Sequence, residues 1–245
     1  MDLSEYEQIV PNAQFEGLTW LTPNQHCAWR VQTLLTKEPD TIRWINSMQP
    51  GELLYDVGAN MGQYSMLAAK RGVNVHAFEP EGQNFALMVR NIQLNELGGL
   101  ITPWPVALSS LCGLEVLHMS TLIAGGSCHS YGDSRDFRGS EKKFPFKQGS
   151  CATTLDVFAR QHGYPQHIKI DVDGFEHKVI EGGFVTLGKC KSVLIEINRN
   201  YPAHMDYIMP RMENLGFTYD PHEANEAMRK DGPFKDVGNI IWHRS

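Results

Sequence analysis

Short apolar runs alternate with segments of helical apolar spacing from residue 53 onward. Residues 53–57 are a compact apolar run, and residues 63–71 follow with the spacing of a helix that ends at Gly72. Residues 73–78 form the next apolar run. Strands that alternate with amphipathic helices are typical of βαβ units, in which the strands run parallel. The pattern therefore predicts an α/β fold with a mostly parallel sheet.

The alternation continues to the end of the chain. Phe85 begins a series of apolar residues at positions i, i+3, i+4 and i+7, which predicts a helix that ends near Asn95. The last two apolar runs flank a polar segment, so we expect them to pair antiparallel. The remaining expected elements are helices over residues 155–162, 175–182 and 205–215, and strands over residues 168–172, 192–197, 217–220 and 239–243.

Two segments depart from this alternation. Residues 101–108 contain Pro103 and Pro105, and because each proline removes a hydrogen-bond donor, we expect an edge strand or an irregular one. Residues 113–119 predict an extra strand. Between residues 120 and 150, glycines interrupt any helical or strand-like spacing of apolar residues, which predicts an insertion loop. Loops of this length are usually functional lids or disordered.

The first fifty residues have helical and loop patterns and contain Trp20, Trp29 and Trp44. We expect them to form a cap that packs on the sheet. The predicted organisation is therefore a cap over residues 1–50 and one domain over residues 51–245, with the insertion at about 120–150. No internal repeat is visible.

The composition is that of a globular protein. The chain has 245 residues, 42% of them hydrophobic, and its 22 Lys and Arg against 28 Asp and Glu give a formal charge of -6. An acidic chain has no overall attraction for polyphosphate, so nucleic acid is not an expected partner. The five cysteines form no C-x-x-C pair, which argues against a zinc site or a disulfide framework.

Nothing in the sequence predicts a membrane location. Residues 1–7 are acidic where a signal peptide would be basic, and no apolar stretch approaches the roughly 18 residues of a spanning helix. We therefore expect a cytoplasmic protein with reduced thiols.

A glycine-rich turn, DVGANMG, joins the first predicted strand to its helix at residues 56–62. Glycine allows a ligand to approach the backbone closely, and the following helix N-terminus favours polar or anionic groups. The spacing is G-x-x-x-G, whereas dinucleotide enzymes have G-x-G-x-x-G. The acidic Asp56 before the turn suits a cationic ligand such as the amino group of S-adenosylmethionine.

Glu79 lies at the end of the second predicted strand. An acid at this position in nucleotide-binding α/β folds accepts hydrogen bonds from ribose hydroxyls. A glycine-rich turn alone is equally typical of an ordinary strand-to-helix connection. Asp56 and Glu79 together predict an adenosine-containing cofactor.

Further polar residues lie at the ends of later strands. Asp171 and Asp173 lie at the end of one predicted strand. Glu196 and Asn198 lie at the end of the next. Acids on adjacent strand tips can hold a divalent cation or supply a general base. Asp173 is also well placed to cap the helix expected from residue 175.

These motifs in combination resemble those of the FkbM family of S-adenosylmethionine-dependent methyltransferases. The resemblance covers roughly residues 55–198, and the family usually has glutamate at the position of Asp173. The motifs are D-V-G-A-N-x-G-x-Y at residues 56–64, F-E-P at 78–80, V-A-L-S at 106–109, T-T-L-D at 153–156 and K-I-D-V-D-G-F-E at 169–176.

The resemblance implies a class I methyltransferase fold, which is Rossmann-like, with a seven-stranded sheet and an antiparallel final hairpin. It also implies O-methylation of sugar or polyketide hydroxyls, with Glu79 at the ribose of S-adenosylmethionine. The other implied cofactor residues are Asp56, Gly58, Asn60 and Gly62 at the methionine portion, Val106 or Ala107 beside the adenine, and Ala59, Tyr64 and Pro80.

The resemblance further implies an active site around Asp171, with Lys169 and Glu176 near it. Some relatives are similar to metal-assisted O-methyltransferases, in which strand-tip acids hold Mg²⁺ or Mn²⁺. In that case Asp171 and Glu196 are the candidate metal ligands. Without a metal, a carboxylate or a histidine would remove the hydroxyl proton.

His177 is a candidate general base, since the ordinary pKa of histidine is near ~6.5, although its place in a first helical turn equally suits a surface residue. In the insertion, basic residues outnumber acidic ones. Arg135 and Arg138 are therefore candidates for binding the diphosphate of a nucleotide sugar, and Asn198 is a further substrate candidate. A solvated flexible loop is the alternative.

The expected function is transfer of a methyl group from S-adenosylmethionine to a hydroxyl of a small acceptor that contains a sugar, such as a nucleotide sugar or a glycan precursor. Two alternatives remain open. The acceptor hydroxyl could belong to a polyketide, or the protein could be a module that binds the cofactor without turnover. The sequence does not support a nicotinamide dehydrogenase, because its glycine-rich turn lacks the G-x-G-x-x-G spacing. A nucleic-acid methyltransferase lacks both an N-P-P-Y-type motif and a basic charge.

Overall fold

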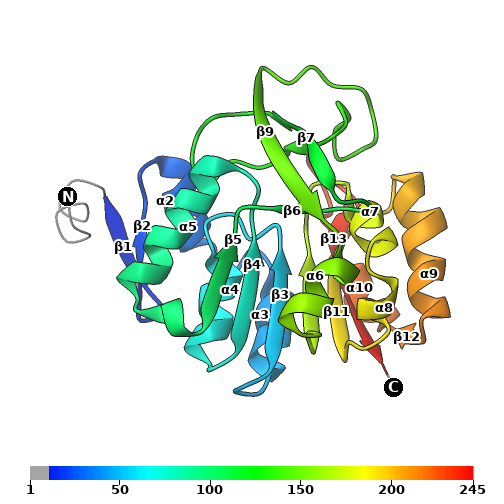
Figure 1. The fold of residues 1–245 in the computed structure, drawn as a ribbon, viewed down its shortest axis with the longest axis horizontal. Coiled ribbons are helices and arrows are strands. Elements are labelled where there is room, and N and C mark those ends of the chain that lie inside the picture. Colours follow the sequence, from blue (N-terminus) through cyan, green and yellow to red (C-terminus); the bar gives the residue numbers. More distant parts are fainter. Residues whose placement is uncertain (1–10, 245) are drawn as a thin grey trace.

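A seven-stranded sheet lies at the centre of the computed structural model, which describes residues 11–244 (Figure 1). The strand order is β12-β13-β11-β10-β3-β4-β5. Neighbours from β11 to β5 run parallel, and β13 pairs antiparallel with β11 and β12. The strands are β3 (Leu53–Val57), β4 (Asn74–Phe78), β5 (Ile101–Trp104), β10 (His167–Ile170), β11 (Ser192–Asn198), β12 (Phe217–Thr218) and β13 (Val237–Arg244).

This topology confirms the predicted α/β fold, the mostly parallel sheet and the antiparallel pairing of the last two strands. The strand interrupted by prolines, β5, lies at the edge of the sheet, where its missing donors cost no ladder hydrogen bond. The later part of the same run, β6 (Ala107–Leu108), leaves this sheet and joins another.

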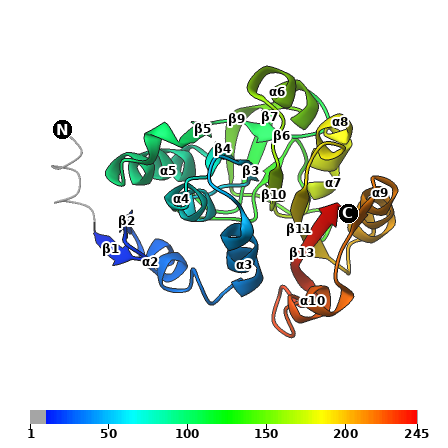
Figure 2. The same ribbon diagram turned by 90° about the horizontal axis from the view of Figure 1, so that it is seen from below.

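Helices cover both faces of the sheet (Figure 2). Apolar residues on one face pack against α2 (Gln25–Gln32), α3 (Pro39–Ser47), α4 (Gln63–Lys70) and α5 (Gly82–Leu94). Those on the other face pack against α6 (Leu155–His162), α7 (Glu176–Glu181), α8 (Phe184–Leu187), the π-helix η2 (Ala203–Ile208), α9 (Met209–Asn214) and α10 (Pro221–Glu226). The short 3-10 helix η1 (Leu97–Gly99) leads into β5.

The cap differs from its prediction in two respects. Residues 12–21 form a hairpin of β1 (Asn12–Phe15) and β2 (Leu18–Leu21) where helical and loop structure was expected. Trp20 and Trp44 are buried in the core, but Trp29 is 45% exposed and does not pack on the sheet. The first ten residues of the expected cap, including the acidic residues 1–7, lie outside the described residues.

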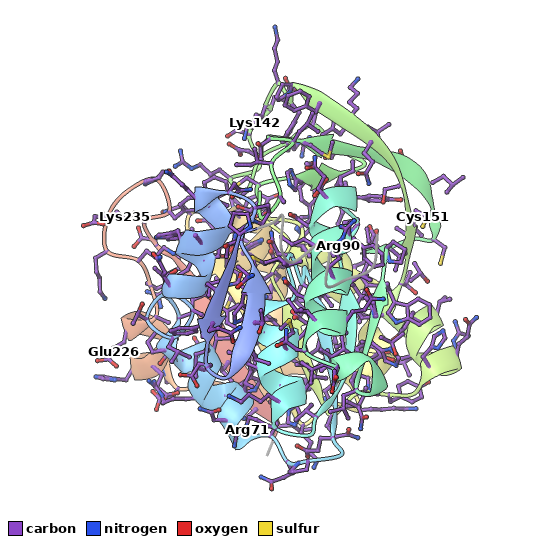
Figure 3. All side chains as sticks on the ribbon, turned by 90° about the vertical axis from the view of Figure 1, so that its left-hand side faces the viewer. Arg71, Arg90, Lys142, Cys151, Glu226 and Lys235 are labelled. Carbon is purple, nitrogen blue, oxygen red and sulfur yellow. The ribbon has the colours of Figure 1, made fainter. Side chains whose placement is uncertain are left out.

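Most of residues 120–145 has no helix or strand, as expected for an insertion loop, and the strand expected over residues 113–119 is present, but residues 146–153 form a strand that the sequence did not predict. A second sheet with the order β6-β9-β7-β8 forms an arm above the body of the molecule, built on β7 (Gly113–Met119), β8 (Ser130–Tyr131) and β9 (Phe146–Thr153). β9 pairs antiparallel with β7 along its length, and backbone hydrogen bonds of this kind do not depend on apolar periodicity. Figure 3 shows Lys142 in the upper part of the arm and Cys151 on its side.

The helix expected over residues 205–215 begins earlier, as the π-helix η2, and continues as α9. No helix in the described part of the chain combines the length and the apolar character that a bilayer span requires.

Candidate active site

A cavity of about 470 Å³ opens at the carboxyl ends of the parallel strands. Its walls include Gly58 after β3, Glu79 after β4, Asp171 after β10 and Glu196 in β11. Ligands of open α/β sheets bind at this edge, because the loops that follow parallel strands converge there. The strand ends singled out in the sequence therefore meet in one cavity.

The glycine-rich turn packs tightly between two strands. Gly58 has a φ of 84°, and a Cβ at this position would lie 1.9 Å from the carbonyl oxygen of Asp171. The amides of Gly58 and Ala59 donate to the carbonyl oxygen of Phe78, at 3.0 and 2.9 Å. Only glycine fits at position 58, and its absence of a side chain brings the backbone of Asp171 against the turn.

Glu79 is buried in the cavity wall, 6% exposed. Its carboxylate accepts hydrogen bonds from the amides of Asn60 and Glu81, at 2.8 and 2.9 Å. Burial raises the pKa of Glu79 to about 7, since the two amide donors only partly offset the loss of water. Ala59, Asn60, Tyr64, Pro80, Val106 and Ala107, all implied in cofactor binding, line the same cavity.

Asp56 and Gly62 do not line the cavity. Asp56 is fully buried, accepts a hydrogen bond from the Ser65 hydroxyl at 2.6 Å and lies 3.7 Å from the ammonium of Lys169. The geometry thus gives Asp56 a role in fixing α4 and Lys169, and does not support direct contact with a cofactor amino group.

Lys169 is a buried cation, 1% exposed. Its ammonium lies 3.1 Å from a carboxylate oxygen of Asp171 and 3.7 Å from one of Asp56. Burial opposes the charge, but Asp171 and Asp56 raise the pKa of Lys169 above its ordinary value. A lysine that stays protonated holds its acidic neighbours in place and cannot accept a proton.

Three carboxylates meet beside Lys169. Oxygens of Asp171, Glu176 and Glu196 lie within 4.8 Å of one another, and we call these three residues the acid cluster. Burial, together with the negative charges of Asp171 and Glu176, raises the pKa of Glu196 well above its ordinary value. Like charges this close need a proton or a cation between them.

The donor set of the acid cluster fits a hard cation. Carboxylate oxygens are the ligands that Mg²⁺ and Mn²⁺ prefer. Glu176 is fully buried, and its Oε1 accepts from the amides of Val172 and Gly174 at 2.8 and 3.3 Å. Its Oε2 lies 3.0 Å from Nε2 of His204 and accepts no hydrogen bond from a described residue. Sequence reasoning paired Asp171 with Glu196 and missed Glu176 as a third ligand.

Asp173 lines the cavity but does not cap α7, which begins without a side-chain cap. Its Oδ2 instead accepts from the amide of Cys128 at 2.6 Å. Burial and the nearby charge of Asp171 raise the pKa of Asp173 to about 6. Asp173 therefore ties the end of β10 to the insertion.

Glu176 belongs to the acid cluster but does not line the cavity. Besides Asp56 and Gly62, four other predicted residues also lie outside the cavity lining: His177, Arg135, Arg138 and Asn198. Arg135 is mostly exposed and lies 3.8 Å from Asp133, while Arg138 donates to the carbonyl of Pro233. Asn198 is buried and donates to the carbonyl of Phe137 at 3.2 Å. These four side chains therefore do not face the cavity that the acid cluster borders.

Several residues of the cavity wall were missed by sequence reasoning. Glu38, at the start of α3, accepts from the Tyr64 hydroxyl at 2.8 Å and from the Asn239 amide at 2.9 Å. Arg229 lies 3.5 Å from Glu196 and 3.8 Å from Glu38. No local motif marks either residue, because both reach the cavity through tertiary packing. The other missed residues include His26, Trp29, Arg30, Lys37, Lys178 and Phe234.

Residues 120–129 of the insertion, which we call the strap, cross the cavity wall. Residues of the strap accept hydrogen bonds from Asn24 and Arg30 of the cap, at 2.9 and 2.7 Å, and from Asn60 of the glycine-rich turn at 2.7 Å. Asn84 of α5 both donates to the strap and accepts from it, at 3.0 and 2.7 Å. The strap therefore fixes one side of the cavity to the cap.

Comparison with known proteins relates the chain to methyltransferases. A family model described as "Methyltransferase FkbM domain" matches residues 56–219. The hexuronic acid methyltransferase AglP of Haloferax volcanii is 27% identical over 171 residues, 69% of this chain and 66% of that protein, just under two thirds of its length. The 31-O-demethyl-FK506 methyltransferase FkbM of Streptomyces tacrolimicus is 38% identical over 56 residues, 22% of each chain.

Solved structures share the fold at low sequence identity. Trm5b of Pyrococcus abyssi matches with a TM-score of 0.52 and 14% identity, over 96% of this chain and 55% of that one. Sp1610 of Streptococcus pneumoniae, solved in complex with S-adenosyl-L-methionine, matches with a TM-score of 0.50 and 12% identity, over 84% of this chain and 72% of that one. The chain therefore has the class I methyltransferase fold.

Proposed function

The chain belongs to the FkbM methyltransferase family, and we propose that it transfers the methyl group of S-adenosylmethionine to a hydroxyl of a small, sugar-containing acceptor. One observation carries the proposal. The cavity joins Glu79, at the place where the fold binds an adenosine ribose, to the acid cluster at the ends of β10 and β11.

Glu79 and the glycine-rich turn support cofactor binding. The carboxylate of Glu79 faces the cavity and is already oriented by the amides of Asn60 and Glu81, so it needs little rearrangement to accept from ribose hydroxyls. Ala107 and Pro80 line the cavity next to Glu79, where an adenine ring would contact them. If S-adenosylmethionine binds at the Glu79 end of the cavity, the acceptor can bind at the end beside the acid cluster.

Methyl transfer requires alignment more than activation. S-adenosylmethionine supplies a methyl group on a cationic sulfur, and the sulfur keeps the electron pair of the broken bond when S-adenosylhomocysteine forms. The acceptor oxygen forms the new bond to the methyl carbon, and its proton must leave to a base. Asp173 lines the cavity beside the acid cluster and is our candidate for the proton acceptor. Holding both reactants in one cavity supplies much of the acceleration.

A divalent cation is a proposed part of the site. Asp171, Glu176 and Glu196 would hold it, because their carboxylate oxygens lie within 4.8 Å of one another. When bound, such a cation lowers the pKa of a coordinated hydroxyl and orients it. Without a cation, these three carboxylates would place negative charges close together in a buried space. This favours metal-assisted methyl transfer over proton removal by a side chain without a metal.

The acceptor class rests on the charges of the cavity and on one relative. AglP is named a hexuronic acid methyltransferase, and a hexuronic acid carries a carboxylate. Arg30, Lys37, Lys178 and Arg229 line the cavity of this chain. Lys37 and Arg229 already lie beside Glu38, so Arg30 and Lys178 are the cations of this set that favour an anionic sugar as acceptor. Because Arg135 and Arg138 lie outside the lining, the geometry gives less support to recognition of a nucleotide diphosphate by these arginines.

A turnover assay tests the proposal. We expect S-adenosylhomocysteine to form when the protein is mixed with S-adenosylmethionine, Mg²⁺ or Mn²⁺ and uronic acid glycosides, with less product from the matched neutral glycosides. EDTA should abolish turnover, and added Mn²⁺ should restore it. Turnover that EDTA leaves unchanged would reject the metal, and absence of S-adenosylhomocysteine with every glycoside and polyketide alcohol would favour a module that binds the cofactor without turnover.

A further inference from the structure

We infer that His204 is a positioning residue that sets the geometry of the acid cluster. The inference rests on the proposed function, because it concerns how the residues proposed to act on the acceptor are held. His204 is 2% exposed and does not line the cavity. It lies on the π-helix η2, and π-helical turns occur frequently next to functional sites.

One ring nitrogen of His204 fixes the end of β11. Its Nδ1 accepts a hydrogen bond from the amide of Asn198 at 3.0 Å. Asn198 is the last residue of β11 and lies two positions after Glu196. Because Nδ1 is an acceptor, the neutral ring carries its proton on Nε2. The contact with the backbone therefore selects the tautomer.

The other ring nitrogen faces the acid cluster. Nε2 of His204 lies 3.0 Å from Oε2 of Glu176, a close contact without the alignment of a hydrogen bond, and neither atom has a hydrogen-bond partner among the described residues. Both side chains are buried, so water does not replace this contact. A proton on Nε2 therefore lies beside the carboxylate of Glu176, and electrostatic attraction holds the two buried side chains in contact.

Glu176 carries this restraint to Asp171. Its Oε1 accepts from the amides of Val172 and Gly174, which form the turn directly after Asp171. His204 and Glu176 thus connect the end of β10 with the end of β11. These two strand ends carry Asp171 and Glu196, and the separation of those carboxylates decides how they act on an acceptor hydroxyl.

Two conservative variants separate the two nitrogens. His204→Gln can place an amide N–H near the position of Nε2 and keeps a polar N–H beside Glu176. His204→Asn can place its oxygen near the position of Nδ1 and keeps the acceptor for Asn198. His204→Ala removes both. His177→Asn is the matched control, since His177 lies beside His204, with ring centroids 6.3 Å apart, and also lies outside the cavity lining.

We expect kcat to fall tenfold or more in His204→Asn and His204→Ala, to recover at least threefold in His204→Gln, and to change less than twofold in His177→Asn. The Kd for S-adenosylmethionine should stay within twofold in all four variants, because Glu79 follows β4 and not β10 or β11. Equal kcat in the Gln and Asn variants, or a Kd that rises in step with the loss of kcat, would overturn the positioning role.

Amide hydrogen exchange provides a readout that needs no turnover. We expect exchange at Val172 and Gly174 to accelerate tenfold or more in His204→Asn, with protection largely kept in His204→Gln. Unchanged exchange in both variants would overturn the inference even if the enzyme is active. If the parent protein forms no S-adenosylhomocysteine, the proposed function fails, and the exchange result still decides whether His204 holds the turn.

Discussion

Single carboxylates decide what the cavity can bind. Glu79, Asp173 and Glu196 have pKa values raised first of all by burial, while Lys169 remains charged between Asp56 and Asp171. A positively charged ligand beside buried carboxylates is favourable, because it lowers the free-energy cost of their ionisation. This is the property that a sulfonium cofactor would use.

Replacing Glu79 tests the cofactor end of the cavity. We expect Glu79→Ala to weaken binding of S-adenosylmethionine by about 1–3 kcal/mol, the range for losing hydrogen bonds to a charged group. Isothermal titration calorimetry measures the change. The control is Glu115→Ala, an exposed glutamate of β7. Unchanged affinity in Glu79→Ala would show that the ribose lies elsewhere.

The same residue predicts a pH dependence of binding. Glu79 has a pKa of about 7 in the free protein, and only its ionised form accepts from both ribose hydroxyls. The affinity for S-adenosylmethionine should therefore rise as the pH increases through 7, and fall by up to about tenfold per pH unit below it. Titrations between pH 5.5 and 8.5 measure this profile, and Glu79→Gln should flatten it. A parent profile as flat as that of the variant would contradict the assignment.

At the level of elements, the strap joins the cap to the methyltransferase core. Its hydrogen bonds come from α2, from the glycine-rich turn and from α5, which are far apart in the sequence. Segments fixed in this way restrict exchange of a ligand between the cavity and solvent. The strap is therefore expected to control how fast the cofactor leaves.

Asn24→Asp tests this role of the strap. Asn24 caps α2 through its Oδ1, which accepts from the Cys27 amide, and its Nδ2 donates to the carbonyl of Ala124 in the strap. Aspartate keeps the cap and loses the donor. We expect the dissociation rate of S-adenosylmethionine to rise about five- to tenfold, the effect of about 1 kcal/mol. Stopped-flow fluorescence measures it, with Asp220→Asn at the cap of α10 as control. Equal rates in both variants would exclude the role.

The sequence predicts those elements whose signals are local. Residues 53–57 and the turn that ends at Gly62 were found because an apolar run, glycines and a helical period follow one another. In the arm, β7 was predicted, but β9 was missed because it contains Gly149 and exposed polar residues, and its pairing with β7 gives no apolar period. The β1–β2 hairpin was missed for a similar reason, since it has only four residues in each strand.

At the scale of the whole molecule, the site depends on contacts between distant parts of the chain. The Asn239 amide of β13 and the Tyr64 hydroxyl of α4 both donate to Glu38 of the cap. Such a residue cannot be found from the sequence, because its partners are set only once the sheet has formed. The strand-end acids could be predicted because parallel strands bring their carboxyl ends to one edge whatever their order.

The lowered pKa of Glu38 predicts how the free energy of unfolding depends on pH. Burial opposes its ionisation, but Lys37 and the hydrogen bonds lower the pKa of Glu38 from 4.5 to about 2. The folded protein therefore gains stability from Glu38 above pH 4.5, and this gain is lost as the pH falls towards 2. We expect Glu38→Gln to lower the free energy of unfolding by about 1–3 kcal/mol at pH 7 and by much less near pH 2.

Urea unfolding at both pH values measures this difference. Glu226→Gln is the matched control, because the side chain of Glu226 is 67% exposed on α10 (Figure 3). A loss of stability in Glu38→Gln that is the same at pH 7 and at pH 2 would show that Glu38 does not act through its charge.

We propose above that the cavity aligns a sulfonium methyl group with a hydroxyl of a sugar. The most direct measurement is NMR spectroscopy of the product formed from S-adenosylmethionine labelled with ¹³C in its methyl group, with a uronic acid glycoside as acceptor. We predict that the label appears as an ether methyl group correlated to a ring carbon of the sugar. A label that stays entirely in S-adenosylmethionine, or that is found in a methyl ester of the acceptor carboxylate, would contradict the claim.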